Sequence, residues 1–161
     1  MLIRPAAAED WPRIHPFFAA IVEEGETYAF PPGLSLEQAQ PWWMEAPPAT
    51  TVVAVEGDEV LGSAKAGPNR PGRGAHVATA SFMVAPEHRG RGVGRALGEH
   101  VLSWARAEGY RSMQFNAVVE TNTGAVRLWQ ELGFQVVGTV PEAFDSRQHG
   151  LVGLHVMFRR L

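Results

Sequence analysis

A segment rich in glycine and arginine near the middle of the chain has the residue types that bind phosphate. It runs from Val84 to Leu97 as VAPEHRGRGVGRAL, with Gly90, Gly92 and Gly94 placed among Arg89, Arg91 and Arg95. Glycine lets a backbone approach a ligand closely, and the first N–H groups of a helix have no intrahelical partner. Anions bind well at such a place. We therefore expect a phosphate-bearing ligand on the backbone N–H groups of this segment.

The spacing excludes two well-known phosphate motifs. The dinucleotide motif GxGxxG fails because its third glycine position is Arg95 or Leu97 in the two possible registers. A Walker loop needs a lysine after its last glycine, and the only lysine is Lys65. What remains is R-x-x-G-x-G, formed by Arg89, Gly92 and Gly94.

The net charge hides a local feature around this segment. The chain has 14 Lys and Arg against 17 Asp and Glu, a formal charge of −3, which argues against a nucleic-acid partner. No acidic residue lies between Glu59 and Glu87, whereas five arginines lie between Arg70 and Arg95. We therefore expect a local cationic stretch that suits a small polyanion.

Composition limits the remaining possibilities. At 161 residues, 45% hydrophobic and 19% charged, the chain is predicted to fold as a single domain, residues 1–161. It has no cysteine, which excludes a thiolate nucleophile and a cysteine-based zinc site. The six histidines show no metal-ligand spacing, so no metal is expected. We see no signal peptide and no membrane span, and we expect a cytoplasmic protein.

Hydrophobic periodicity predicts the elements that position the segment. Helices are expected over 9–24, 35–46, 92–108 and 122–132. Strands are expected over 2–4, 51–55, 60–66, 76–84, 113–119, 134–140 and 151–159, with loops over 25–33, 69–74 and 141–150. This order predicts an α/β (α+β) fold: a mixed, mostly antiparallel sheet of about seven strands flanked by about four helices.

A second motif lies one strand after the first. Residues 122–134, NTGAVRLWQELGF, fit the pattern N-x-x-A-x-x-L-[YW]-x-x-x-G-F. With V-x-P-x-x-R-G-x-G-x-G before it, the chain resembles the GNAT superfamily of acyl-CoA-dependent N-acetyltransferases over nearly its whole length. The resemblance implies a transferase that takes acetyl-CoA as its acetyl donor. The alternative is that the first motif is a solvated basic turn and the second a core helix.

The resemblance assigns the donor site residue by residue. Backbone N–H groups from Arg91 to Arg95 would hold the CoA pyrophosphate, and strand residues Phe82 to Val84 would pair with pantetheine. An amide of that strand would stabilise the thioester oxyanion. Asn122 would contact the pantetheine or diphosphate arm. The full expected donor set is Phe82, Met83, Val84, Arg89, Gly90, Arg91, Gly92, Val93, Gly94, Arg95, Asn122, Ala125 and Trp129.

Catalytic residues are less well defined. Trp129 stands where many GNAT enzymes have a tyrosine that protonates the leaving thiolate, and an indole N–H donates a hydrogen bond but is no useful acid. Tyr28 is a candidate acid, or an aromatic wall of the acceptor pocket. The segment around Asn116 also resembles the branch containing azetidine-2-carboxylate acetyltransferases, with Asn116 in the acceptor site as either a site residue or a structural hydrogen-bonder. Thr79 aligns with a second Asn of that branch.

The acceptor side is expected to be formed by Glu26, Thr27, Tyr28 and Asn116. Trp42 and Trp43 are expected to pack the second helix, with lining of the acceptor site as the alternative. We predict a small-molecule amine acceptor, such as an amino or imino acid, and a homodimer. The alternatives are acetylation of protein N-termini or lysines, and a non-catalytic acyl-CoA-binding module.

Overall fold

A single seven-stranded sheet forms the centre of the protein in the computed structural model, which describes residues 1–161. The strand order is β1-β2-β3-β4-β5-β7-β6. The strands are β1 (Leu2–Pro5), β2 (Thr50–Glu56), β3 (Glu59–Pro68), β4 (Val77–Val84), β5 (Ser112–Val119), β6 (Gln135–Ser146) and β7 (Gly150–Arg160). The predicted mixed α/β fold with a mostly antiparallel sheet is confirmed.

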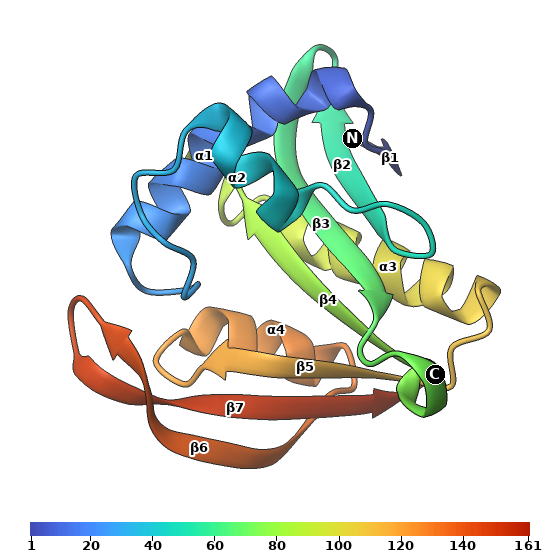
Figure 1. The fold of residues 1–161 in the computed structure, drawn as a ribbon, viewed down its shortest axis with the longest axis vertical. Coiled ribbons are helices and arrows are strands. Elements are labelled where there is room, and N and C mark those ends of the chain that lie inside the picture. The colour runs from blue at the N-terminus through green and yellow to red at the C-terminus, as the bar shows by residue number, and fades with distance from the viewer.

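Four α-helices cover the two faces of the sheet (Figure 1). They are α1 (Trp11–Glu24), α2 (Leu36–Trp43), α3 (Val93–Ala107) and α4 (Thr123–Glu131). One core packs α3 and α4 against the sheet through residues such as Leu97, Val101 and Trp129. A second core packs α1 and α2 on the other face through Trp11, Phe18 and Trp43. No helix combines the length and the apolar run needed to cross a membrane.

The sheet separates between β4 and β5. This is the only parallel pair, and its register contains just Val77↔Ser112 and Ala78↔Met113. Beyond these residues the two strands diverge, as Figure 1 shows. The edge groups of β4 after Ala78 are therefore not paired with β5. The divergence of β4 and β5 therefore leaves strand edges inside the sheet open to a ligand.

The structure corrects three of the predicted boundaries. Residues 141–146 belong to β6 and are not a loop, although the register with β7 shifts between Val140 and Phe144, where Glu142 has a positive φ of 53°. Phe144 holds this stretch on the sheet because it is buried with Val119 and Val152. Helix α2 ends at Trp43, not at Ala46, and α1 is preceded by a short 3₁₀ turn, Ala8–Asp10.

Candidate functional site

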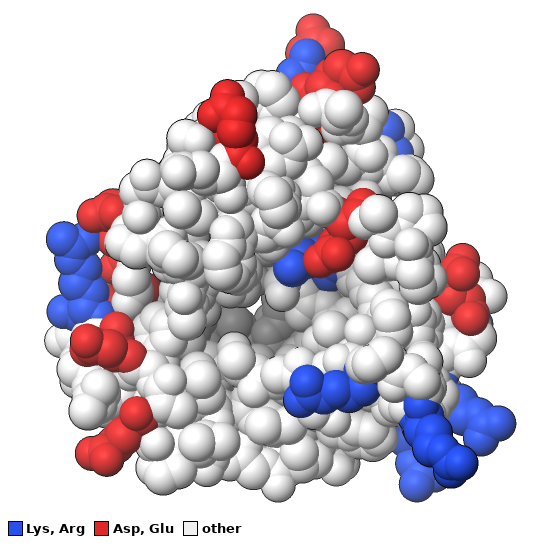
Figure 2. Space-filling model, in the orientation of Figure 1, with Lys and Arg blue, Asp and Glu red and all other residues white.

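A cavity of about 440 Å³ opens where β4 and β5 diverge. Its walls come from four elements: β4, β5, α4 and the loop between α1 and α2. The lining residues are Thr27, Tyr28, Ala29, Phe30, Trp42, Thr79, Ala80, Ser81, Phe82, Phe115, Asn116, Ala117, Val118, Val119, Asn122, Ala125 and Trp129. None of these side chains is charged. Figure 2 shows the hollow opening among mostly uncharged atoms.

The turn between β4 and α3 presents a row of unused backbone donors. Gly90 and Gly92 have φ of 77° and 80°, a region that glycine enters without steric cost. The first backbone hydrogen bond of the helix is Ala96 N–H to the Gly92 carbonyl, so no N–H from Gly90 to Arg95 donates to a backbone carbonyl. A Cβ at Gly90 or Gly92 would meet nothing within 4 Å, so the space above the turn is open. This arrangement fits the diphosphate of a nucleotide-like ligand.

Three of the five arginines expected to form a cationic stretch lie beside carboxylates. Arg89 pairs with Glu24 at 2.9 Å, Arg91 with Glu56 at 3.0 Å, and Arg95 with Glu131. Arg91 also bonds His88 Nδ1 at 2.9 Å. The acidic partners come from distant parts of the chain. The backbone N–H groups of the turn thus remain without a protein partner beside these ion pairs.

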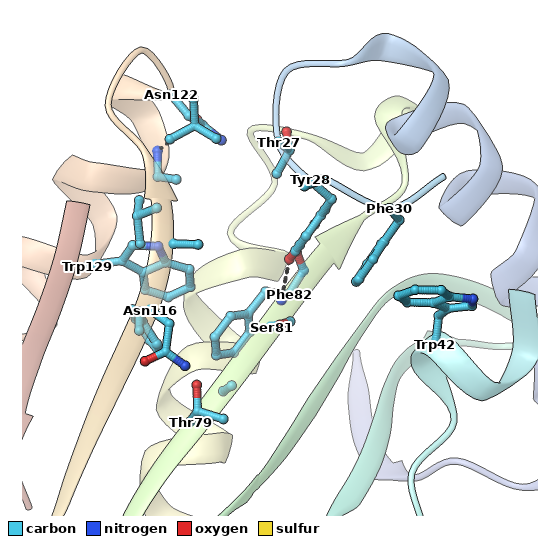
Figure 3. Close-up of a pocket in the computed structure, with 17 residues that line it drawn as sticks. Thr27, Tyr28, Phe30, Trp42, Thr79, Ser81, Phe82, Asn116, Asn122 and Trp129 are labelled. Carbon is cyan, nitrogen blue, oxygen red and sulfur yellow. Dashed lines mark hydrogen bonds between the residues drawn. The ribbon is translucent and has the colours of Figure 1, made fainter. Parts of the chain in front are cut away.

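Tyr28 is bonded to the edge of β4. Its hydroxyl donates to the Phe82 carbonyl at 2.6 Å and accepts from the Phe82 N–H at 2.9 Å (Figure 3). Removal of the phenol from water raises the pKa of Tyr28 above its usual range. A phenol with a raised pKa whose proton is held by a carbonyl is a poor general acid. Of the two interpretations from the sequence, the geometry favours the wall of the pocket.

Asn116 and Thr79 lie on the two diverging strands and both line the cavity (Figure 3). Asn116 Nδ2 donates to Asn69 Oδ1 at 2.6 Å, and Asn116 Oδ1 accepts from Gln114 Nε2 at 2.8 Å. These two bonds fix the amide plane and leave one Nδ2 hydrogen for a ligand. Asn116 is thus both a cavity residue and a structural hydrogen-bonder.

Aromatic side chains form much of the cavity wall. Trp129 is buried and packs on Phe82, with ring centroids 4.6 Å apart, and on Phe115, at 5.0 Å. On the opposite side, Phe30 stacks on Tyr28 at 5.1 Å and contacts Trp42 at 5.6 Å. Trp42 lines the cavity whereas Trp43 is fully buried, so the expectation that both pack the helix is wrong for Trp42.

A second, polar cavity of about 440 Å³ adjoins the first and shares Thr27, Phe82 and Asn122 with it. Met83, Val84 and Arg89 line this second cavity. Asn122 caps α4 by accepting from the Ala125 N–H at 3.2 Å. Of the predicted donor residues, Phe82, Asn122, Ala125 and Trp129 line the first cavity, and Gly90 to Arg95 form the turn beside them.

Glu26 lies in the second cavity and has a structural task. Its carboxylate accepts from the Ser146 hydroxyl at 2.6 Å and from the Gln148 N–H at 2.8 Å. These bonds tie the loop after α1 to the turn between β6 and β7. Of the predicted acceptor-side residues, Thr27, Tyr28 and Asn116 line the first cavity and Glu26 does not.

Several residues of the site were not predicted from the sequence, among them Asn69, Ser81 and Phe30. Asn69 comes from the loop after β3 and has no local signal, since its partner Asn116 lies 47 positions away. Ser81 and Phe30 line the cavity without belonging to a motif. The placement of Trp42 was within reach, because Ala39 and Trp43 mark the buried face of α2 and Trp42 is off that face. No group of three or more His, Asp or Glu side chains is placed to hold a metal ion.

Comparisons with known proteins identify the family. Residues 10–134 match the model of the acetyltransferase (GNAT) family. The N-acetyltransferase aca1 of Schizosaccharomyces pombe is 30% identical over 143 residues, which cover 80% of this chain and 68% of that protein. The structure of a GCN5-related N-acetyltransferase from Kribbella flavida is 61% identical, with a TM-score of 0.96 over 99% of this chain and 97% of that one. A phosphinothricin acetyltransferase from Sinorhizobium meliloti in complex with acetyl-CoA is 25% identical, with a TM-score of 0.88 over 99% of this chain and 88% of that one. This chain therefore belongs to the acetyltransferase (GNAT) family and uses acetyl-CoA as its acetyl donor.

Proposed function

We propose that the protein moves the acetyl group of acetyl-CoA to the amine of a small molecule such as an amino or imino acid. The observation that carries this proposal is the uncharged cavity at the divergence of β4 and β5, next to the row of free N–H groups. The cavity would hold the thioester and the amine, and the row of N–H groups would hold the diphosphate of the same donor.

The donor would be oriented by backbone groups. N–H groups from Gly90 to Arg95 would bind the diphosphate, as the helix N-terminus favours. The edge of β4 from Phe82 to Val84, which β5 does not pair, would hydrogen-bond the pantetheine arm, and the Phe82 N–H would stabilise the negative charge that develops on the thioester oxygen. Asn122, Ala125 and Trp129 would flank the arm on the α4 side.

The reaction would be a direct transfer. The amine nitrogen bonds to the carbonyl carbon, the C–S bond breaks, and one proton passes from the nitrogen to the departing sulfur, so that amide and CoA thiol are formed. Asn116 Nδ2 and the Thr79 hydroxyl are the polar groups placed to orient the amine. The Trp129 indole would donate a hydrogen bond to the sulfur and supplies no proton.

The absence of charged side chains in the cavity bears on how the acceptor amine loses its proton. No carboxylate lines the cavity to hold an ammonium or to remove its proton. A lysine-type amine is neutral in about one molecule in 2,500 at pH 7, whereas a peptide α-amine of pKa about 7.8 is neutral in about one in seven. A low amine pKa would let transfer proceed without a base from the protein, whereas an amine that is mostly protonated at pH 7, as in free amino and imino acids, would lose its proton to water before it attacks. The structurally similar phosphinothricin acetyltransferase of Sinorhizobium meliloti supports a small amine as the acceptor.

The test is a screen of CoA thiol release from acetyl-CoA with three acceptor groups: amino and imino acids, simple amines, and short peptides. The proposal expects turnover with members of the first two groups. Turnover with peptides alone would point to acetylation of protein N-termini or lysines. Binding of acetyl-CoA without turnover on any amine would point to a non-catalytic module, the alternative that Trp129 raises.

The azetidine-2-carboxylate branch enters the same screen, with azetidine-2-carboxylate and proline among the imino acids. A single domain over residues 1–161, a homodimer and a cytoplasmic location stay predictions. Sedimentation of the purified protein tests the dimer.

A further inference from the structure

The hydroxyl of Tyr28 occupies the place that the acyl oxygen needs. It accepts the Phe82 N–H at 2.9 Å and donates to the Phe82 carbonyl at 2.6 Å, so both edge groups of this residue are taken (Figure 3). The proposed function assigns the same N–H to the thioester oxygen, and this inference rests on that assignment. One N–H makes one strong, near-linear hydrogen bond, so the two oxygens compete for it.

We infer that Tyr28 is a positioning residue that holds the Phe82 amide until the acyl group of acetyl-CoA displaces it. The hydroxyl satisfies a donor and an acceptor that the divergence of β4 from β5 leaves without strand partners. An unpaired polar group away from water is costly, so the bonded tyrosine stabilises the empty site. The arriving acyl oxygen takes over the N–H, and the hydroxyl moves away from it.

Movement of Tyr28 would reach the acceptor side of the cavity. Its ring lies parallel to that of Phe30, with an interplanar angle of 3° and centroids 5.1 Å apart. Phe30 in turn contacts Trp42, whose side chain lies at the mouth of the cavity. Displacement of the hydroxyl therefore shifts the aromatic wall. Donor binding would reshape the place where the amine enters, which predicts tighter acceptor binding in the presence of an acylated donor.

The substitution Tyr28→Phe separates this inference from a fixed structural role. It removes the hydroxyl that competes for the Phe82 N–H and keeps the stacked ring. The affinity for acetyl-CoA should rise about three- to tenfold, as expected for one lost competing hydrogen bond. The affinity for CoA should change less, since CoA shares the pantetheine arm but has no acyl oxygen. Calorimetric titration of both ligands gives the ratio.

The matched control is Tyr110→Phe. Tyr110 is the other tyrosine of the chain and packs on Trp104, away from the cavity. This variant should leave both affinities unchanged. An acetyl-CoA to CoA affinity ratio in Tyr28→Phe equal to or below that of the wild type would overturn the inference. Thiol release by the wild type is measured separately, so failure of the proposed function can be distinguished from failure of the inference about Tyr28.

A second measurement needs no substitution for its readout. With only two tyrosines, protein labelled with 3-fluorotyrosine gives two ¹⁹F resonances. Acetyl-CoA should shift one resonance strongly, and CoA should shift it much less. Equal shifts with the two ligands would also overturn the inference.

Discussion

The glycine at position 92 offers a test of the donor turn that does not depend on knowing the acceptor. Gly92 precedes α3 with a φ of 80°, and an added Cβ would meet no atom within 4 Å. The substitution Gly92→Ala therefore adds backbone strain without a clash. An L-residue in the left-handed region costs about 1–2 kcal/mol.

That cost must appear in one of two places. If the turn keeps its shape in the free protein, the free energy of unfolding falls by about 1–2 kcal/mol. If the turn relaxes in the free protein, acetyl-CoA must restore the strained conformation on binding, and the affinity for acetyl-CoA falls about 5- to 30-fold. In both cases the sum of the two losses is the same. Calorimetric titration with acetyl-CoA and chemical denaturation of the free protein measure the two parts.

Gly109→Ala is the matched control. Gly109 follows the other end of α3 with a φ of 83°, and its Cβ would also meet nothing within 4 Å. It should lose similar stability and keep the wild-type affinity for acetyl-CoA. Wild-type stability together with wild-type affinity in Gly92→Ala would refute the role given to the turn.

Three further predictions concern the acceptor, the core and the charge at the start of α1. In steady-state kinetics, Asn116→Ala should lower kcat/KM for the acceptor tenfold or more and leave the affinity for acetyl-CoA unchanged. Asn69→Ala removes one hydrogen bond to Asn116 and should lower kcat/KM about 2- to 13-fold. If the two effects add in the double variant, Asn69 does not position Asn116. Trp129→Ala should lower the free energy of unfolding in urea by about 3–5 kcal/mol, because the ring is buried; a loss below about 1 kcal/mol would contradict its packing role. Two hydrogen bonds from Arg4 hold the pKa of Asp10 below its usual range, so the pair stabilises the fold at neutral pH. This contribution is lost as the pH falls below about 4, so the Tm difference between wild type and Asp10→Asn should shrink in acid. A Tm difference that stays constant with pH would contradict this role of the ion pair.

Local patterns were enough to predict most of the elements and the glycine turn between β4 and α3. The Gly90–Gly94 spacing lies within one turn, and the hydrophobic spacing of α3 and α4 follows from the helical repeat. The segment 141–146 was misjudged because Pro141 is typical of a loop, whereas the buried Phe144 holds a bulged strand.

Contacts between residues far apart in the chain could not be predicted from the sequence. Glu24 and Arg89 are 65 positions apart, so an absence of acids near the arginines gave no information about their partners. The bond of Tyr28 to Phe82 spans 54 positions, so the sequence could offer an acid or a pocket wall for this tyrosine but not its contact with the β4 edge. Such pairings arise from the tertiary fold and have no local signal.

Transfer of a labelled acetyl group tests the central claim most directly. An excess of protein is mixed with ¹³C-acetyl-CoA and an active amine from the screen, and the masses of the protein and of the amine are read over a single turnover. We expect the label to appear on the amine at the rate at which the CoA thiol is released, with no acetylated form of the protein at any time. Label that passes through the protein, or thiol release without labelled amine, would contradict it.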